Sequence, residues 1–81
     1  MNKKEFILDS LIDDDEAFTQ IVEYFELVAE IEISSEEIKI LISEMIEEGY
    51  ITINYSWKNE YNEYPYSLTE KGRKAWENIQ E

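Results

Sequence analysis

The chain has 81 residues, of which 20 are acidic and 7 are basic, so its formal charge is −13 at neutral pH. It contains neither Cys nor His, which excludes disulfide frameworks, thiol nucleophiles, thiolate metal sites and the most common general base. With 43% hydrophobic residues it is too apolar for a disordered acidic tail. This length favours a single domain over residues 1–81, with a small core and little room for an enclosed active site. We therefore expect no catalysis and no cofactor.

The composition also bears on location and partners. No apolar run approaches the ~20 residues that a membrane helix needs, and no signal-peptide pattern follows Met1. The sequence therefore predicts a cytoplasmic protein that does not associate with membranes. A charge of −13 on so small a surface repels nucleic acid and anionic lipid.

Residues 3–12 and 16–30 have the spacing of amphipathic helices. Between them, Asp13-Asp14-Asp15 is expected to cap the second helix, because an Asp carboxylate accepts hydrogen bonds from the free amides of a helix N-terminus. These carboxylates lack the glycine and the distant Glu of a calcium-binding loop, so we expect no bound metal. The core stripe of the second helix consists of Phe18, Ile21, Val22, Phe25 and Ala29.

Residues 35–48 form the third predicted helix. Ser34 and Glu37 have the S-x-x-E spacing of a capping box, in which each side chain binds the free backbone amide of the other residue. Gly49 follows at the place where helices commonly end in a left-handed residue. The inward stripe consists of Ile38, Leu41, Ile42 and Met45.

After Gly49 the apolar period changes from about 3.6 to 2 residues, which is typical of a half-buried strand. The alternating apolar residues are Ile51, Ile53, Tyr55 and Trp57. We predict a strand at 50–56, a polar loop, and an antiparallel return strand at 64–68. Thr69 is expected to cap a closing helix at 70–79. The predicted fold class is therefore mostly α with a β-hairpin.

This order, three helices, a two-stranded hairpin and a closing helix, resembles that of a winged helix-turn-helix domain. The stretch 46–51, with the sequence IEEGYI, resembles the junction between that family's recognition helix and its hairpin, the wing. The stretch 66–73, with the sequence YSLTEKGR, resembles the passage by which many bacterial winged-helix regulators enter their closing helix. The resemblance implies the fold and leaves the function open, because this fold serves DNA-binding regulators, protein-docking modules and parts of larger assemblies.

In family members that bind DNA, the third helix lies in the major groove, so the resemblance assigns the reading positions to Glu36, Ile40, Ser43 and Glu47. Bases are read mainly by Arg, Lys, Asn and Gln, and phosphates are held by cations. The third helix instead has five Glu against Lys39, a net charge of −4. This charge argues against nucleic acid as a partner of the isolated domain. We interpret the four positions as the centre of a surface that recognises another protein, and a basic partner would suit its charge.

Two alternatives remain open. The first is a DNA-binding transcription regulator of the winged-helix type, whose contacts would come from the few cations available. These are Lys39, Lys58, Lys71, Arg73 and Lys74. The second alternative is a DNA mimic, in which the acidic surface occupies the DNA site of another protein. Binding to random duplex DNA would distinguish the first alternative from protein recognition.

A second apolar stripe on the predicted helix 16–30 consists of Tyr24, Leu27 and Ile31. One interpretation is a homodimer face with Leu27 near its centre. The other is that the helix ends early and its last residues turn back into the core. The sequence leaves both interpretations open.

Overall fold

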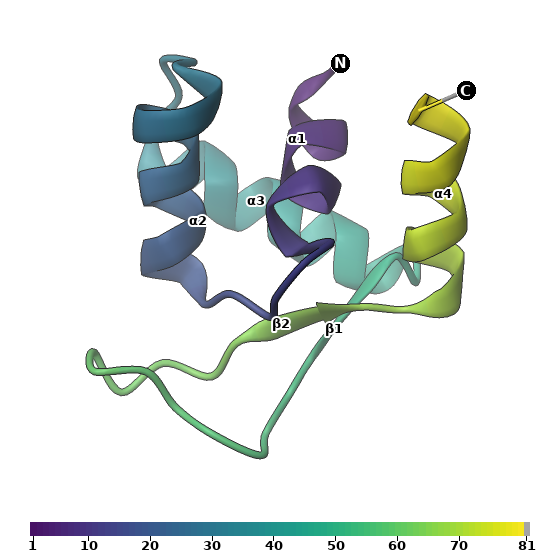
Figure 1. Ribbon diagram of the computed structural model, residues 1–81. Helices are drawn as coiled ribbons and strands as arrows, with labels where there is room; N and C mark the ends of the chain where they lie inside the picture. The colour runs from purple at the N-terminus through teal and green to yellow at the C-terminus, as the bar shows by residue number, and fades with distance from the viewer. Residues whose placement is uncertain (81) are drawn as a thin grey trace.

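The computed structural model describes residues 1–80 (Figure 1). Its elements in chain order are α1 (Lys3–Leu11), α2 (Phe18–Tyr24), the π-helical turn η1 (Phe25–Ala29), α3 (Ser35–Glu47), β1 (Ile51–Ile53), β2 (Tyr66–Leu68) and α4 (Glu70–Gln80). The two strands form an antiparallel sheet, and the loop between them runs out beneath the start of α2 (Figure 1). The predicted fold class, mostly helical with one hairpin and a closing helix, is confirmed.

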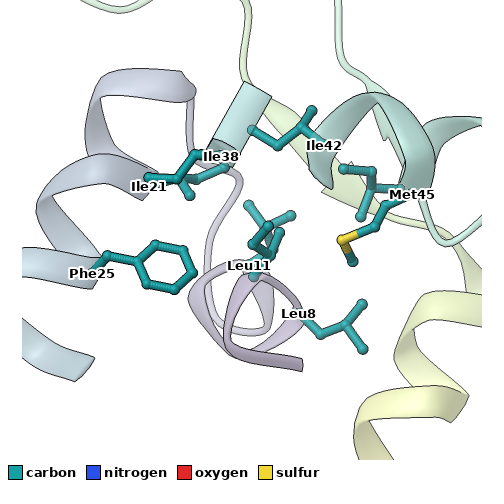
Figure 2. Packing of buried hydrophobic residues seen from close by; sticks show 9 residues of the cluster. Leu8, Leu11, Ile21, Phe25, Ile38, Ile42 and Met45 are labelled. Carbon is teal, nitrogen blue, oxygen red and sulfur yellow. The ribbon is translucent and has the colours of Figure 1, made fainter. Parts of the chain in front are cut away.

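Helix α1 lies at the centre of the fold and packs against α2, α3, α4 and β2. Figure 2 shows Leu11 of α1 between Phe25 of η1 and Met45 of α3. Apolar burial stabilises a fold by roughly 25 cal/mol per Å², so this cluster decides which side of each helix faces inward. The buried residues of the cluster are Ile7, Leu8, Leu11, Ile21, Phe25, Ile38, Ile42, Met45 and Ile51.

Helix α2 begins at Phe18, two residues later than predicted, and the triple aspartate does not cap it. Its N-cap is Ala17, whose backbone amide donates to Gln20 Oε1 at 3.2 Å. The expectation that residues 13–15 cap this helix is therefore wrong. The side chain of Asp15 and the backbone of Glu16 pair with the hairpin instead, which keeps this segment outside the helix.

The base of the hairpin holds this stretch. Asp15 Oδ2 accepts hydrogen bonds from Asn54 Nδ2 at 2.8 Å and from Ser67 Oγ at 2.6 Å. Glu16 forms an isolated antiparallel bridge with Tyr66, in which the Tyr66 amide donates to the Glu16 carbonyl at 2.8 Å. One isolated bridge thus joins the segment before α2 to β2.

The turn η1 ends at Glu30, whose backbone is left-handed with φ of 54°. The amides of Glu30 and Ile31 both donate to the carbonyl of Phe25, and the second of these bonds is 3.0 Å long. A π-helical turn holds one more residue than an α-helical turn and shifts the following side chains around the axis. As a result Ile31 packs against the core. The helix predicted at 16–30 therefore consists of two parts over 18–29.

Helix α3 begins as predicted after Ser34, whose Oγ accepts from the amide of Glu37 at 3.1 Å. The Glu37 carboxylate, expected to complete a capping box, instead lies 2.7 Å from Lys3 Nζ, because α1 passes close by. The helix ends at Glu47, and Gly49 follows with φ of 84°, the left-handed conformation that the sequence predicted there.

The strands are shorter than the predicted 50–56 and 64–68. The paired residues are Ile51 with Leu68, Thr52 with Ser67, and Ile53 with Tyr66. Asn54 Oδ1 then accepts from the amide of Ser56 at 2.9 Å and turns the chain out of the ladder. Tyr55 and Trp57, expected to be half-buried, are therefore 68% and 45% exposed.

Thr69 joins the hairpin to α4 and confirms the predicted cap. Its Oγ1 donates to the carbonyl of Gly49 at 2.6 Å and accepts from the amide of Gly72 at 3.0 Å. Its amide donates to the carbonyl of Tyr50 at 3.1 Å. The two stretches that carry the family resemblance thus fasten the end of α3 to the start of α4.

Candidate nucleic-acid interface

Helix α3 turns one side to the core and the opposite side to solvent. The four predicted reading positions, Glu36, Ile40, Ser43 and Glu47, are all exposed. They recur at i, i+4, i+7 and i+11, so they line one side of the helix. We call this strip the α3 outer face. Ile40, at its centre, is 58% exposed.

Three of the five glutamates in residues 35–48 pair with lysines of α1 and do not belong to the α3 outer face. Lys3 Nζ lies 2.7 Å from Glu37 Oε2, and Lys4 Nζ lies 3.3 Å from Glu44 Oε1 and 3.0 Å from Glu48 Oε1. Exposed ion pairs of this kind contribute little to stability, but they neutralise charge locally. When the two lysines are counted, the helix and its partners carry two excess negative charges instead of four.

A groove separates α3 from the hairpin, and its walls are largely aromatic and aliphatic. Its lining includes Phe18, Lys39, Ser43, Ile46, Tyr55 and Tyr64. Tyr55 and Tyr64 pack edge to face with ring centroids 4.9 Å apart. Lys58 Nζ lies 4.7 Å from the centroid of Tyr64, and Lys39 Nζ lies 5.1 Å from that of Phe18. Lys39 therefore lines the groove itself, and Lys58 contacts one of its aromatic walls.

The hairpin loop is fastened to the start of α2. The side-chain amide of Asn59 donates to Gln20 Oε1 and to Glu63 Oε1, both at 2.9 Å, and Glu63 Oε1 also accepts from the amide of Thr19 at 3.2 Å. Burial opposes ionisation of Glu63, but the hydrogen bonds from Asn59 and Thr19 and the charge of Lys39 hold its pKa below the ordinary value. This network keeps the loop beside the groove.

The remaining predicted cations, Lys71, Arg73 and Lys74, lie on α4 and do not border this groove. Lys71 Nζ donates to the carbonyl of Glu48 at 2.6 Å. Lys74 Nζ lies 3.3 Å from Glu70 Oε1. Arg73 borders a separate hollow beside the loop that precedes α2. The structure thus divides the five predicted cations into a pair at the groove and a group on α4.

The structure does not bring Tyr24, Leu27 and Ile31 together on one exposed face. Tyr24 and Ile31 pack against the core, whereas Leu27 is 73% exposed next to Val28, which is 68% exposed. The Tyr24 hydroxyl donates to Asp9 Oδ2 at 2.5 Å, and burial together with this bond raises the pKa of Tyr24. Ile31 turns into the core as the second interpretation expected, although the helix runs to Ala29 and does not end early, and the homodimer face at Leu27 stays a prediction.

Sequence reasoning missed the residues that shape the site from other elements. Lys3 and Lys4 pair with α3 from a distant part of the chain, so no local pattern reveals them. The role of Asn59 is weakly indicated by the sequence, because Asn in a polar loop commonly accepts hydrogen bonds from the amides that follow it. Its Oδ1 accepts from the amides of Tyr61 and Glu63 at 3.0 Å and 2.9 Å.

Comparison with known proteins identifies the family. Residues 5–81 match the family model described as a winged helix DNA-binding domain. The chain belongs to this family. No curated protein matches it.

Two solved structures of PadR proteins share the fold. Bacillus subtilis PadR, in complex with operator DNA, gives a TM-score of 0.80 at 21% identity over 95% of this chain and 44% of PadR. A PadR family transcription regulator from hypervirulent Clostridium difficile R20291 gives a TM-score of 0.83 at 18% identity, over 95% of this chain and 81% of that chain. This chain thus spans less than half the length of Bacillus subtilis PadR.

Family membership contradicts one prediction from the sequence. The charge argued against nucleic acid as a partner, but the family is one of DNA-binding domains. The prediction treated the five glutamates of residues 35–48 alike, whereas three of them contact lysines of α1. The family also supports the alternative, a DNA-binding regulator, better than it supports protein recognition. The DNA-mimic interpretation stays a prediction.

Within residues 1–80, no group of three or more acidic side chains is placed to hold a metal ion. In the same part of the chain, no helix combines the length and the apolar character needed to cross a membrane.

Proposed function

We propose that the chain is the DNA-binding module of a PadR-like transcription regulator, acting in the cytoplasm and without catalysis. In this proposal α3 enters the major groove of an operator-like duplex, and the hairpin contacts the backbone. The observation that supports it most is the exposed α3 outer face beside a groove that Lys39 lines and whose Tyr64 wall contacts Lys58, in a chain whose family binds DNA.

The charge of −13 limits how this binding works. The Debye length is about 8 Å at physiological ionic strength, so acidic groups far from the interface act weakly there. Lys39 and Lys58 would make two phosphate contacts. A plot of the logarithm of the binding constant against the logarithm of the salt concentration should then have a slope of about −1.8. Affinity for random DNA is therefore low, and the contacts of α3 with bases carry much of the discrimination.

Fluorescence anisotropy with short random duplexes at about 50 mM salt tests the proposal, because electrostatic binding is strong there. The wild type is expected to bind with a shallow negative salt slope, and Lys39→Glu and Lys58→Glu to weaken binding. Lys74→Glu is the matched control, since it makes the same charge change at an exposed position of α4.

Binding that is lost in the two groove variants and kept in the control supports the proposal. No binding to any duplex contradicts it. An equal loss in Lys74→Glu also contradicts it, because that result would mean that overall charge, and not the groove, governs the interaction.

A further inference from the structure

The α3 outer face has none of the side chains that read purines by paired hydrogen bonds. Arg and Lys recognise guanine through O6 and N7, and Asn and Gln recognise adenine through N6 and N7. The α3 outer face offers two carboxylates, a hydroxyl and an isoleucine instead. Lys39 is adjacent in sequence, but its ammonium lies over the ring of Phe18 on the side of the groove.

The available groups differ in how sharply they distinguish bases. The carboxylates of Glu36 and Glu47 are repelled by the acceptor atoms of guanine, and the hydroxyl of Ser43 pairs with donors and acceptors alike. An aliphatic side chain has one favourable partner among the base edges of the major groove, the 5-methyl group of thymine. Ile40 is therefore the residue of this strip with the clearest single preference.

The position of Ile40 suits this role. It lies in the N-terminal half of α3, the part of a recognition helix that contacts base edges in helix-turn-helix proteins. Its side chain is 58% exposed, and Ile38 and Ile42 on either side supply the buried contacts of the helix. A single exposed isoleucine is common on protein surfaces, but here it is the central apolar group on a face whose two carboxylates can only accept hydrogen bonds from base amino groups.

We propose that Ile40 is a specificity-determining residue that selects thymine by packing against its 5-methyl group. This inference rests on the proposed DNA-binding function and adds the base class that α3 prefers. Burial of one methyl group is worth about a fourfold change in affinity. Replacing a thymine that Ile40 contacts by deoxyuridine is therefore expected to weaken binding of the duplex about fourfold.

The test begins with selection of tight-binding duplexes from a random pool by the wild-type chain. The selected duplex is then resynthesised with deoxyuridine in place of one thymine at a time, which removes the methyl group and leaves every hydrogen-bonding atom unchanged. Anisotropy titrations compare the wild type, Ile40→Ala, and Ser43→Ala, the control on the same strip. Because Ile40 is exposed and Ala favours helices, Ile40→Ala is expected to fold normally, which circular dichroism checks.

The inference predicts that at least one replacement weakens wild-type binding about fourfold, that Ile40→Ala no longer distinguishes thymine from deoxyuridine there, and that Ser43→Ala still does. It is overturned if the wild type binds the selected duplex but no replacement changes its affinity, or if Ile40→Ala keeps the wild-type ratio. A chain that binds no duplex overturns the proposed function itself, and this inference with it.

Discussion

Gly72 packs directly against the backbone of Tyr50: a Cβ atom added to Gly72 would lie 2.0 Å from the Tyr50 carbonyl oxygen. That separation is far inside van der Waals contact, and the obstacle is backbone that cannot rotate away. The same carbonyl accepts the amide of Thr69. The glycine therefore lets α4 begin immediately beside the end of α3, which is the helix that forms the candidate interface.

We predict that Gly72→Ala lowers the free energy of unfolding by at least about 2 kcal/mol, because α4 must move to accommodate the new methyl group. Urea denaturation followed by circular dichroism measures the change. Glu77→Ala, an exposed position on the same helix, is the control and should stay within about 0.5 kcal/mol of the wild type. A Gly72→Ala variant as stable as the wild type would contradict the packing described here.

Asp9 connects three helical elements through one carboxylate. It accepts from the hydroxyl of Tyr24 at 2.5 Å and from Trp76 Nε1 at 3.0 Å. Asp9→Ala leaves both half-buried donors without this partner, so we expect a loss of about 1–3 kcal/mol in the free energy of unfolding. Chemical denaturation followed by tryptophan fluorescence measures it, with the exposed Asp13→Ala as control. Equal stability of the two variants would show that the carboxylate does not stabilise the fold.

Glu30 has a left-handed backbone that favours glycine. We expect Glu30→Gly to raise the free energy of unfolding by up to about 1 kcal/mol, because the cost of placing a Cβ atom in this conformation disappears. Glu26→Gly, inside the helical turn, should instead destabilise by about 1 kcal/mol. Thermal melts of both variants check these opposite signs. A Glu30→Gly variant less stable than the wild type would contradict the left-handed assignment.

Glu16 sits among other carboxylates at the base of the hairpin. Burial, followed by the charges of Asp14, Glu23 and Asp15, raises its pKa above the ordinary 4.5. A carboxyl group whose pKa is raised by folding destabilises the folded state when it is ionised. We therefore expect Glu16→Gln to raise the melting temperature at pH 7, and the gain to vanish as the pH falls below about 4.5, where both states are protonated.

The control for this measurement is Glu60→Gln, an exposed position in the hairpin loop that makes the same change in charge. It should leave the melting temperature close to that of the wild type at every pH. A gain in Glu16→Gln that persists at low pH would mean that the amide stabilises the fold for a reason unrelated to charge.

Local patterns predicted much of the fold. Ser34, Gly49 and Thr69 each mark a helix boundary through hydrogen bonds or backbone angles within a few residues, and all three have the predicted role. The end of the second helix could not be predicted in this way, because the residue with the left-handed backbone there is Glu30 and not a glycine. The π-helical turn there brings Ile31 against the core, and a local pattern does not contain such a contact.

Long-range pairing explains what the sequence could not reveal about the site. Local rules predict that Asp15 caps a helix, but its hydrogen-bond partners Asn54 and Ser67 belong to the hairpin. In the same way, the acidity of α3 was clear while its pairing with Lys3 and Lys4 was not. The α3 outer face was predictable because it follows from helical periodicity alone, and its role in binding stays a prediction.

The central claim is that the α3 outer face and the hairpin bind duplex DNA, and nuclear magnetic resonance titration tests it most directly. Amide signals of the isotope-labelled chain are recorded as a selected duplex is added at low salt. We expect saturable shifts confined to the α3 outer face and to the loop around Lys58, while signals around Lys74 on α4 stay in place. An unchanged spectrum, or shifts centred on α4, would contradict it.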